Sequence, residues 1–177
     1  LASSAASDVY KRQLRTCLES IKKKCMYPSY EILIIENNST EEATFSYYKE
    51  LEAQGIRVLK YPKQGFNYSA INNFGVKEAK GEYLLFLNND MEIITPDFME
   101  KMVSNLQRPQ IGAVGAKLYY PDDTIQHAGV IMGINGSAGH SHKSYPRKAV
   151  GDLYRLVTTQ DYMAVTGACL MLSLIHI

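Results

Sequence analysis

Short apolar runs alternate along this chain with segments whose apolar residues recur at helical spacing. The runs Ile32–Ile35 and Tyr83–Leu87 have the length of strands and no polar face. Strands that are apolar on both faces are typical of a parallel sheet that is covered by helices on each side. We therefore predict an α/β fold, Rossmann-like, with a mostly parallel sheet and flanking helices.

The predicted elements follow one another at short intervals. Helical spacing and helix-start signals predict helices that begin near Leu14, Ser39, Tyr68 and Thr95. Strands are predicted over 30–35, 56–61, 83–87 and 111–118. Residues 119–157 hold five glycines and three of the four histidines, and we expect short strands and loops there.

Composition excludes several classes of protein. The 19 Lys and Arg residues nearly balance the 18 Asp and Glu residues, which gives no electrostatic case for nucleic-acid binding. Three cysteines without a CxxC pair favour reduced thiols over a disulfide framework or a zinc site. No apolar run reaches the roughly 18 residues of a membrane span, and we expect a cytoplasmic protein.

The two ends of the chain differ in character from the rest. Residues 1–13 are small, polar and aperiodic, and residues 172–177 stop inside an apolar run. We expect a non-native or disordered leader over 1–13, a partial domain over 14–171 and a non-native tail over 172–177.

A carboxylate and two amides follow the apolar strand predicted over 83–87. In parallel sheets, ligands bind beyond the carboxyl ends of the strands. Asp90 is there a candidate ligand for a divalent cation that neutralises a diphosphate, and Asn88 a candidate for contact with a ribose or a metal-bound water. The same residues also fit an ordinary Asn/Asp turn.

Two further polar groups are predicted near this edge of the sheet. Glu36 and Asn38 follow the preceding apolar run, where a carboxylate can accept from a base N–H or a ribose hydroxyl. A helix-capping turn also explains this spacing and is favoured when these residues are taken alone. Asn72 and Asn73 could hold a ribose or a diphosphate, although they also fit the polar side of an amphipathic helix.

Three histidines lie in the glycine-rich region: His127, His140 and His142. A spacing of two residues would put His140 and His142 on one face of a strand. No carboxylate or cysteine stands at ligand spacing, so hydrogen bonding to an acceptor or a phosphate is favoured over a metal site. Surface loop histidines are the remaining alternative.

Taken together, these segments resemble glycosyltransferase family 2. The resemblance rests on residues 27–39, on the block 73–90 that ends in Asn88-Asn89-Asp90, and on residues 112–118, 124–129 and 165–169. The last three are similar to the rhamnosyltransferase-like, O-antigen-type branch. The resemblance covers nearly all of 14–171.

The resemblance implies a GT-A fold, a UDP- or dTDP-sugar donor and a divalent cation, Mn²⁺ or Mg²⁺. By position, Glu36 stands for the acid that binds base or ribose, and Asn88-Asn89-Asp90 stands for an Asp-x-Asp metal motif. Because Asn88 replaces the first acid of that motif, Asp90 is expected to be the principal protein carboxylate on the metal.

The resemblance also implies that parts of the domain are missing. We expect the first strand and the C-terminal part to be absent, and with them the general base of an inverting sugar transfer. The expected acceptor is a glycan or a lipid-linked glycan, which allows a peripheral position at the cytoplasmic face of a membrane. A nucleotidyltransferase and a non-catalytic nucleotide-sugar-binding module remain as alternatives.

Overall fold

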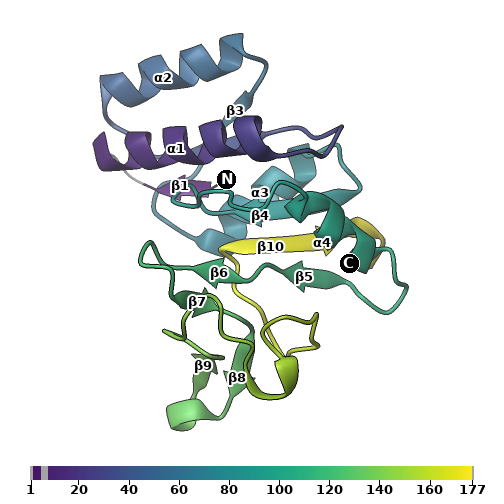
Figure 1. The fold of residues 1–177 in the computed structure, drawn as a ribbon. Helices are drawn as coiled ribbons and strands as arrows, with labels where there is room; N and C mark the ends of the chain where they lie inside the picture. The colour runs from purple at the N-terminus through teal and green to yellow at the C-terminus, as the bar shows by residue number, and fades with distance from the viewer. Residues whose placement is uncertain (1, 5–7, 177) are drawn as a thin grey trace.

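The computed structural model describes residues 2–4 and 8–176. Figure 1 shows two small sheets with their helices and, below them in this view, a lobe of short strands. Each sheet has three strands, in the orders β1-β2-β3 and β4-β10-β5. The predicted α/β class is confirmed, and the helices and strands predicted up to residue 107 are all present.

The first sheet is parallel throughout. It contains β1 (Ala2–Ser4), β2 (Leu33–Asn37) and β3 (Arg57–Lys60), connected by α1 (Asp8–Lys24) and α2 (Glu42–Ala53). Ile34 of β2 packs in one cluster with side chains of α1 and α2, whereas Ile35 packs with Ile71 of α3 (Tyr68–Glu78) on the other side. Burial of β2 on both faces explains why its sequence has no polar face.

The second sheet is antiparallel and was not predicted as a separate unit. It contains β4 (Tyr83–Leu87), β10 (Cys169–Ser173) and β5 (Ala113–Gly115), and α4 (Phe98–Leu106) packs against β10 and β5. After the long excursion through the lower lobe, β10 returns between β4 and β5 and takes the place next to β4. The mostly parallel arrangement therefore holds within the first sheet only.

The lower lobe is built of two-stranded pairs. β6 (Leu118–Tyr119) pairs with β7 (Ile125–His127), and β8 (Val130–Met132) pairs with β9 (Ala138–His140). Short 3₁₀ helices lie in this lobe at Ile134–Gly136 and Asp152–Tyr154, and another, Leu174–His176, follows β10 of the second sheet. This region matches the predicted short strands and loops.

Helix α1 holds the two sheets together. Leu14 and Leu18 face the first sheet, whereas Cys17 and Ile21 belong to the core cluster of the second. Burial raises the pKa of the Cys17 thiol to about 12, and that of Cys169 likewise. All three cysteines are free thiols.

The ends of the described chain differ from expectation in three places. A short strand, β1, lies beside β2 where a first strand was expected to be missing. Helix α1 begins at Asp8 instead of near Leu14, and β10 extends to Ser173. Residues 1, 5–7 and 177 of the predicted leader and tail lie outside the described residues. No described helix combines the length and the hydropathy that crossing a bilayer requires.

Candidate functional site

The loops that follow β2 and β3 are fastened to each other at the carboxyl edge of the first sheet. The backbone N–H of Tyr61 donates to the carbonyl oxygen of Glu36 at 2.8 Å. The side-chain amide of Asn38 donates to the carbonyl oxygen of Gly65 at 3.4 Å, and Asn38 itself adopts a left-handed conformation, with φ at 59°. These contacts fix the polar residues that follow both strands in one place.

Glu36 is a buried carboxylate with one unused oxygen. Its side chain is 3% exposed, and Oε1 accepts from the backbone N–H of Ser39 at 2.6 Å. Oε2 is buried and has no hydrogen-bond partner among the described residues. An unsatisfied buried oxygen costs folding free energy, so its retention points to a donor group supplied by a ligand.

The alternative of a helix-capping turn at Ser39 is not supported. Helix α2 has Glu41 as its N-cap residue, and no side chain caps it by a hydrogen bond. Ser39 instead gives its N–H to Glu36, so the turn serves the carboxylate.

The Asn88-Asn89-Asp90 segment continues β4 at the same kind of edge. The N–H of Asn88 donates to the carbonyl oxygen of Ala168 at 2.9 Å, which anchors the segment to the residues before β10. Asp90 is exposed and forms no ion pair or hydrogen bond within the described part of the chain. Its carboxylate is therefore free to bind a cation.

Asn89 was not identified as a candidate from the sequence. Its side chain is only 9% exposed, and its buried Nδ2 has no partner among the described residues. The alternation of side chains along an extended chain could have suggested that Asn89 faces away from its two neighbours.

Helix α3 contributes Asn72 and Asn73 and one residue that was not predicted. Asn72 donates to the carbonyl oxygen of Tyr68 at 2.9 Å within the helix, and Asn73 is exposed. The hydroxyl of Tyr68 donates to the carbonyl oxygen of Gly167 at 3.2 Å, where a Cβ on Gly167 would lie 2.8 Å from that hydroxyl. Tyr68 thus connects the first sheet to the segment that anchors Asn88.

Two of the three predicted histidines lie together. His127 Nδ1 is 2.7 Å from His140 Nδ1, and the side chain of His127 is 1% exposed. Burial, followed by the charge of His140, lowers the pKa of His127 to about 4. His142 lies apart, with its Nδ1 2.6 Å from the Ser141 hydroxyl.

The prediction that His140 and His142 share one face of a strand was wrong. Strand β9 ends at His140, and His142 has a φ of 52° in the following turn. A left-handed residue breaks the alternation on which that prediction rested. No group of three or more His, Cys, Asp or Glu side chains in the described residues could hold a metal ion.

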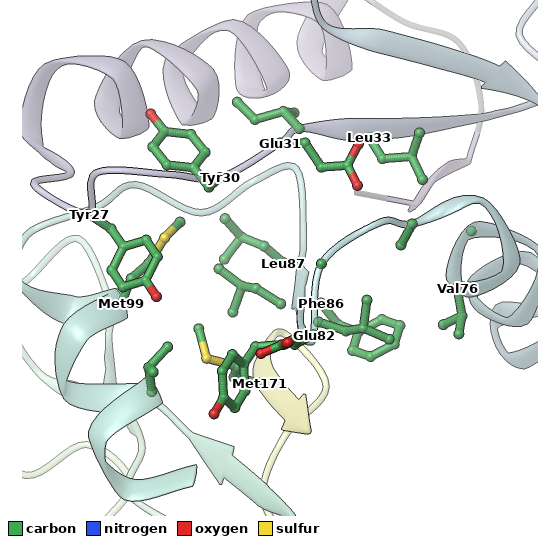
Figure 2. Close-up of a pocket in the computed structure, with 18 of the residues that line it drawn as sticks. Tyr27, Tyr30, Glu31, Leu33, Val76, Glu82, Phe86, Leu87, Met99 and Met171 are labelled. Carbon is green, nitrogen blue, oxygen red and sulfur yellow. The ribbon is translucent and has the colours of Figure 1, made fainter. Parts of the chain in front are cut away.

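A separate cleft lies between the two sheets. A cleft of about 440 Å³ runs between β2 and β4 and is lined mainly by apolar side chains (Figure 2). Leu33, Phe86 and Met171 are among the lining residues, and Glu31 and Glu82 stand at the amino-terminal ends of β2 and β4. Asn72, one of the predicted site residues, also lines this cleft, so the structure places that amide in the cleft lining.

The register of β1 relates this cleft to the first sheet. Ala2 of β1 pairs with Ile35 of β2, so a strand continued toward its N-terminus would pass opposite Ile34 and then Leu33. Leu33 lines the cleft, and β4 forms the facing edge of the second sheet. We therefore place the candidate site at the carboxyl edge and not in this cleft.

Comparison with known proteins gave matches over most of the chain. The model of "Glycosyl transferase family 2" matches residues 9–167. An uncharacterized protein of Sinorhizobium fredii is 45% identical over 161 residues, which are 90% of this chain and 18% of that protein. The O-antigen biosynthesis protein RfbC of Myxococcus xanthus is 41% identical over 160 residues, which are 90% of this chain and 12% of that protein.

Among solved structures, a mannosyltransferase of Pyrobaculum calidifontis in complex with GDP-Man and Mn²⁺ is similar in fold. The TM-score is 0.53 at 17% sequence identity, over 69% of this chain and 35% of that one. The chain thus spans less than a fifth of the length of the two curated relatives.

Proposed function

The chain belongs to glycosyltransferase family 2. We propose on this basis that Glu36 and Asn38 after β2, together with Asn88 and Asp90 after β4, bind a nucleotide-sugar donor and a divalent cation. The longer protein would transfer the sugar to a glycan or lipid-linked glycan acceptor in polysaccharide synthesis of the O-antigen type. Support for the pathway comes from the similarity to RfbC.

The observation that carries the proposal is the unused Oε2 of Glu36. A buried carboxylate oxygen can accept from a ribose hydroxyl or from a base N–H, and that bond would offset the cost of burying it. Asn38 lies in the same turn, where its Nδ2 donates to Asn37 and Gly65, and its side-chain oxygen could serve as a second acceptor beside Glu36. These residues would seat the nucleoside end of the donor.

The residues at the end of β4 fit a cation that binds through the donor. Mg²⁺ and Mn²⁺ at phosphate sites are held by one or two carboxylates together with the phosphate oxygens. Asp90 supplies one exposed carboxylate, and Asn88 adds an uncharged amide. When bound, the cation would stabilise the charge that develops on the departing diphosphate.

The general base for an inverting transfer is assigned to a residue outside the described chain. The four acids of the lower lobe, Asp122, Asp123, Asp152 and Asp161, do not lie in a motif that would nominate one of them as the base. Asp122 accepts from Thr124, and Asp123 pairs with Arg147 at 3.0 Å. The residues present would thus bind and orient the donor, and deprotonation of the acceptor would need the longer protein.

The first test is calorimetric titration of the chain with UDP, dTDP and GDP, each with and without Mn²⁺. GDP is included because the structural neighbour holds GDP-Man. Binding that requires Mn²⁺ supports the proposal and identifies the nucleotide. A folded chain that binds none of the three contradicts it. Sugar transfer by the longer protein would then exclude a non-catalytic binding module.

A further inference from the structure

The hydrogen-bonded pair of His127 and His140 links the lower lobe to the candidate donor site. The two rings meet edge to face, with centroids 5.0 Å apart and planes at 83°. His127 comes from β7 and is buried, whereas His140 ends β9 and is exposed. The pair therefore joins a side chain without access to solvent to one that can reach a ligand.

The surroundings of His127 determine where its proton lies. Its Nε2 is 3.3 Å from the backbone nitrogens of both Gly129 and Thr166. Both N–H groups donate, so Nε2 must carry a lone pair. Because burial keeps the pKa of this ring at about 4, the ring is neutral near pH 7 and its proton is on Nδ1.

That proton in turn determines the tautomer of His140. Nδ1–H of His127 donates to Nδ1 of His140 over 2.7 Å, so this nitrogen of His140 acts as the acceptor. In the neutral ring of His140, the remaining proton is then on Nε2. His140 consequently presents a fixed N–H donor to the outside.

We propose that His127 is a positioning residue that fixes His140 as a hydrogen-bond donor to the diphosphate of the nucleotide sugar. This inference rests on the proposed function and deepens it, because it adds two residues of the lower lobe to the site of Glu36 and Asp90. His140 would contact the ligand, whereas His127 would act through His140.

A short stretch of chain places the pair near the end of β4. Thr166, whose N–H donates to His127, is two residues from Ala168, whose carbonyl oxygen accepts from Asn88. Two residues of extended chain span at most about 7 Å. The His127 ring is therefore connected through residues 166–168 to Asn88, the first residue of the segment that carries Asp90.

The backbone around His127 is tightly held. Gly129, which supplies one of the two N–H groups, has a φ of 99°, and a Cβ there would lie 2.4 Å from the ring of Tyr162. Only glycine fits this conformation and this approach. The donor to Nε2 is thus fixed in place, which in turn fixes the proton on Nδ1.

The charge of the surrounding chain favours an anionic ligand. Residues 138–151 contain Lys143, Arg147 and Lys148 and no acidic residue. Lys143 and Lys148 are exposed and form no ion pair within the described residues. A fixed N–H donor beside exposed ammonium groups suits the oxygens of a diphosphate better than a neutral hydroxyl.

The test uses the chain labelled with ¹⁵N-histidine and long-range ¹H–¹⁵N correlation spectra. In the free protein we expect His127 to be protonated on Nδ1 and His140 on Nε2. Addition of UDP with Mg²⁺, or of pyrophosphate with Mg²⁺, should shift the His140 Nε2 resonance. Uridine, which has no phosphate, should leave it unchanged.

Three variants separate binding from mere structure. We expect His140→Ala to weaken UDP binding about 10-fold, which corresponds to about 1.4 kcal/mol. His140→Gln should retain most of the affinity, because its amide can both accept from His127 and donate to the ligand. His142→Asn is the matched control, since Asn tolerates the left-handed conformation there and His142 is not part of the pair.

The outcomes test the positioning role of His127 and the contact of His140 with the diphosphate separately. A proton on Nδ1 of His140 in the free protein would overturn the positioning role of His127. Calorimetric binding of UDP with an unmoved His140 resonance would overturn the contact to the diphosphate and leave the donor site intact. If no nucleotide and no pyrophosphate binds, the contact fails together with the proposed function, and the tautomers still decide the positioning role.

Discussion

The carboxyl edge of the first sheet and the lower lobe each bury a polar side chain, but the two side chains differ in how many of their hydrogen-bonding atoms have a partner. Glu36 uses one oxygen and leaves Oε2 without a partner among the described residues. His127, in contrast, has partners for both ring nitrogens. The carboxyl edge of the first sheet therefore keeps a buried acceptor without a protein donor among the described residues, whereas the lower lobe completes the hydrogen bonds of His127 internally and leaves His140 exposed.

The largest expected effect is a loss of folding stability at low pH, which tests whether the folded protein requires a neutral His127. The pKa of His127 is about 4 in the folded protein, whereas the ordinary histidine value of 6.5 applies in the unfolded chain. Between pH 4 and pH 6.5 the unfolded chain therefore binds more protons than the folded protein. The contribution of His127 to the free energy of unfolding should therefore be fully present above pH 6.5, and about 3 kcal/mol of it should be lost as the pH drops toward 4. Chemical denaturation from pH 7 to pH 4 measures this loss.

The control for that experiment replaces His127 and His142 separately. His127→Gln removes the titrating ring, so the slope of stability against pH should become shallower than in the wild type. His142→Asn should leave the slope unchanged. An unchanged slope in His127→Gln would show that His127 does not hold the low pKa inferred here.

The next effect concerns the cation at the upper edge. Asp90→Asn keeps the shape of the side chain and removes its charge, so binding of the nucleotide with Mn²⁺ should weaken about 100-fold, or about 2.7 kcal/mol. Asp97→Asn is the matched control, because Asp97 is paired with Lys101 at the start of α4. Equal losses in both variants, measured by calorimetry, would contradict a specific role of Asp90.

A third prediction concerns the cleft between β2 and β4. Fusion of Val-Ile-Val-Ile-Val in front of Leu1 would continue β1 alongside Leu33, and we expect a gain in unfolding free energy of about 2 kcal/mol after the cost of ordering. The same fusion with Ser-Gly-Ser-Gly-Ser serves as the control. If both fusions have equal stability, the cleft is not a gap in the sheet.

The smallest predicted effect distinguishes the two ends of β2. Glu36→Gln keeps an oxygen for the Ser39 N–H but turns the unused acceptor into a donor, so nucleotide binding should weaken about 10-fold. Glu31→Gln, at the amino end, removes a surface pair with Arg57 at 3.2 Å and should leave binding unchanged. Isothermal titration of both variants makes the comparison. If nucleotide affinity fell only in Glu31→Gln, the site would lie in the cleft and not at the carboxyl edge.

The sequence predicted the upper half of the molecule better than the lower half. An apolar run such as Ile32–Ile35 predicts a buried strand, because both of its faces must be covered by other side chains. Glu36, which follows this run, lies at the predicted edge of the sheet. The division of the sheet was not predictable in this way, because β10 pairs with β4 from more than 80 residues further along the chain. Local patterns do not encode such pairings.

The same reason explains the errors around the histidines. Their spacing suggested one strand, whereas the contact between His127 and His140 depends on the pairing of β8 with β9 and on the return of Thr166. Asn89 and Tyr68 were missed because their significance lies in burial and in one long-range hydrogen bond. Only the folded chain reveals such contacts.

In the proposed function, the nucleotide and its cation bind at the carboxyl edge, beyond Glu36 and Asp90, and not in the cleft between β2 and β4. The most direct test is paramagnetic broadening of backbone amide resonances by Mn²⁺ in the presence of UDP, or of whichever of UDP, dTDP and GDP calorimetry shows to bind. We expect the strongest broadening at residues 88–92, weaker broadening at 36–40 and 63–67, and little at Glu31 and Glu82. Broadening centred on Glu31 and Glu82, or none with the nucleotide bound, would contradict this placement.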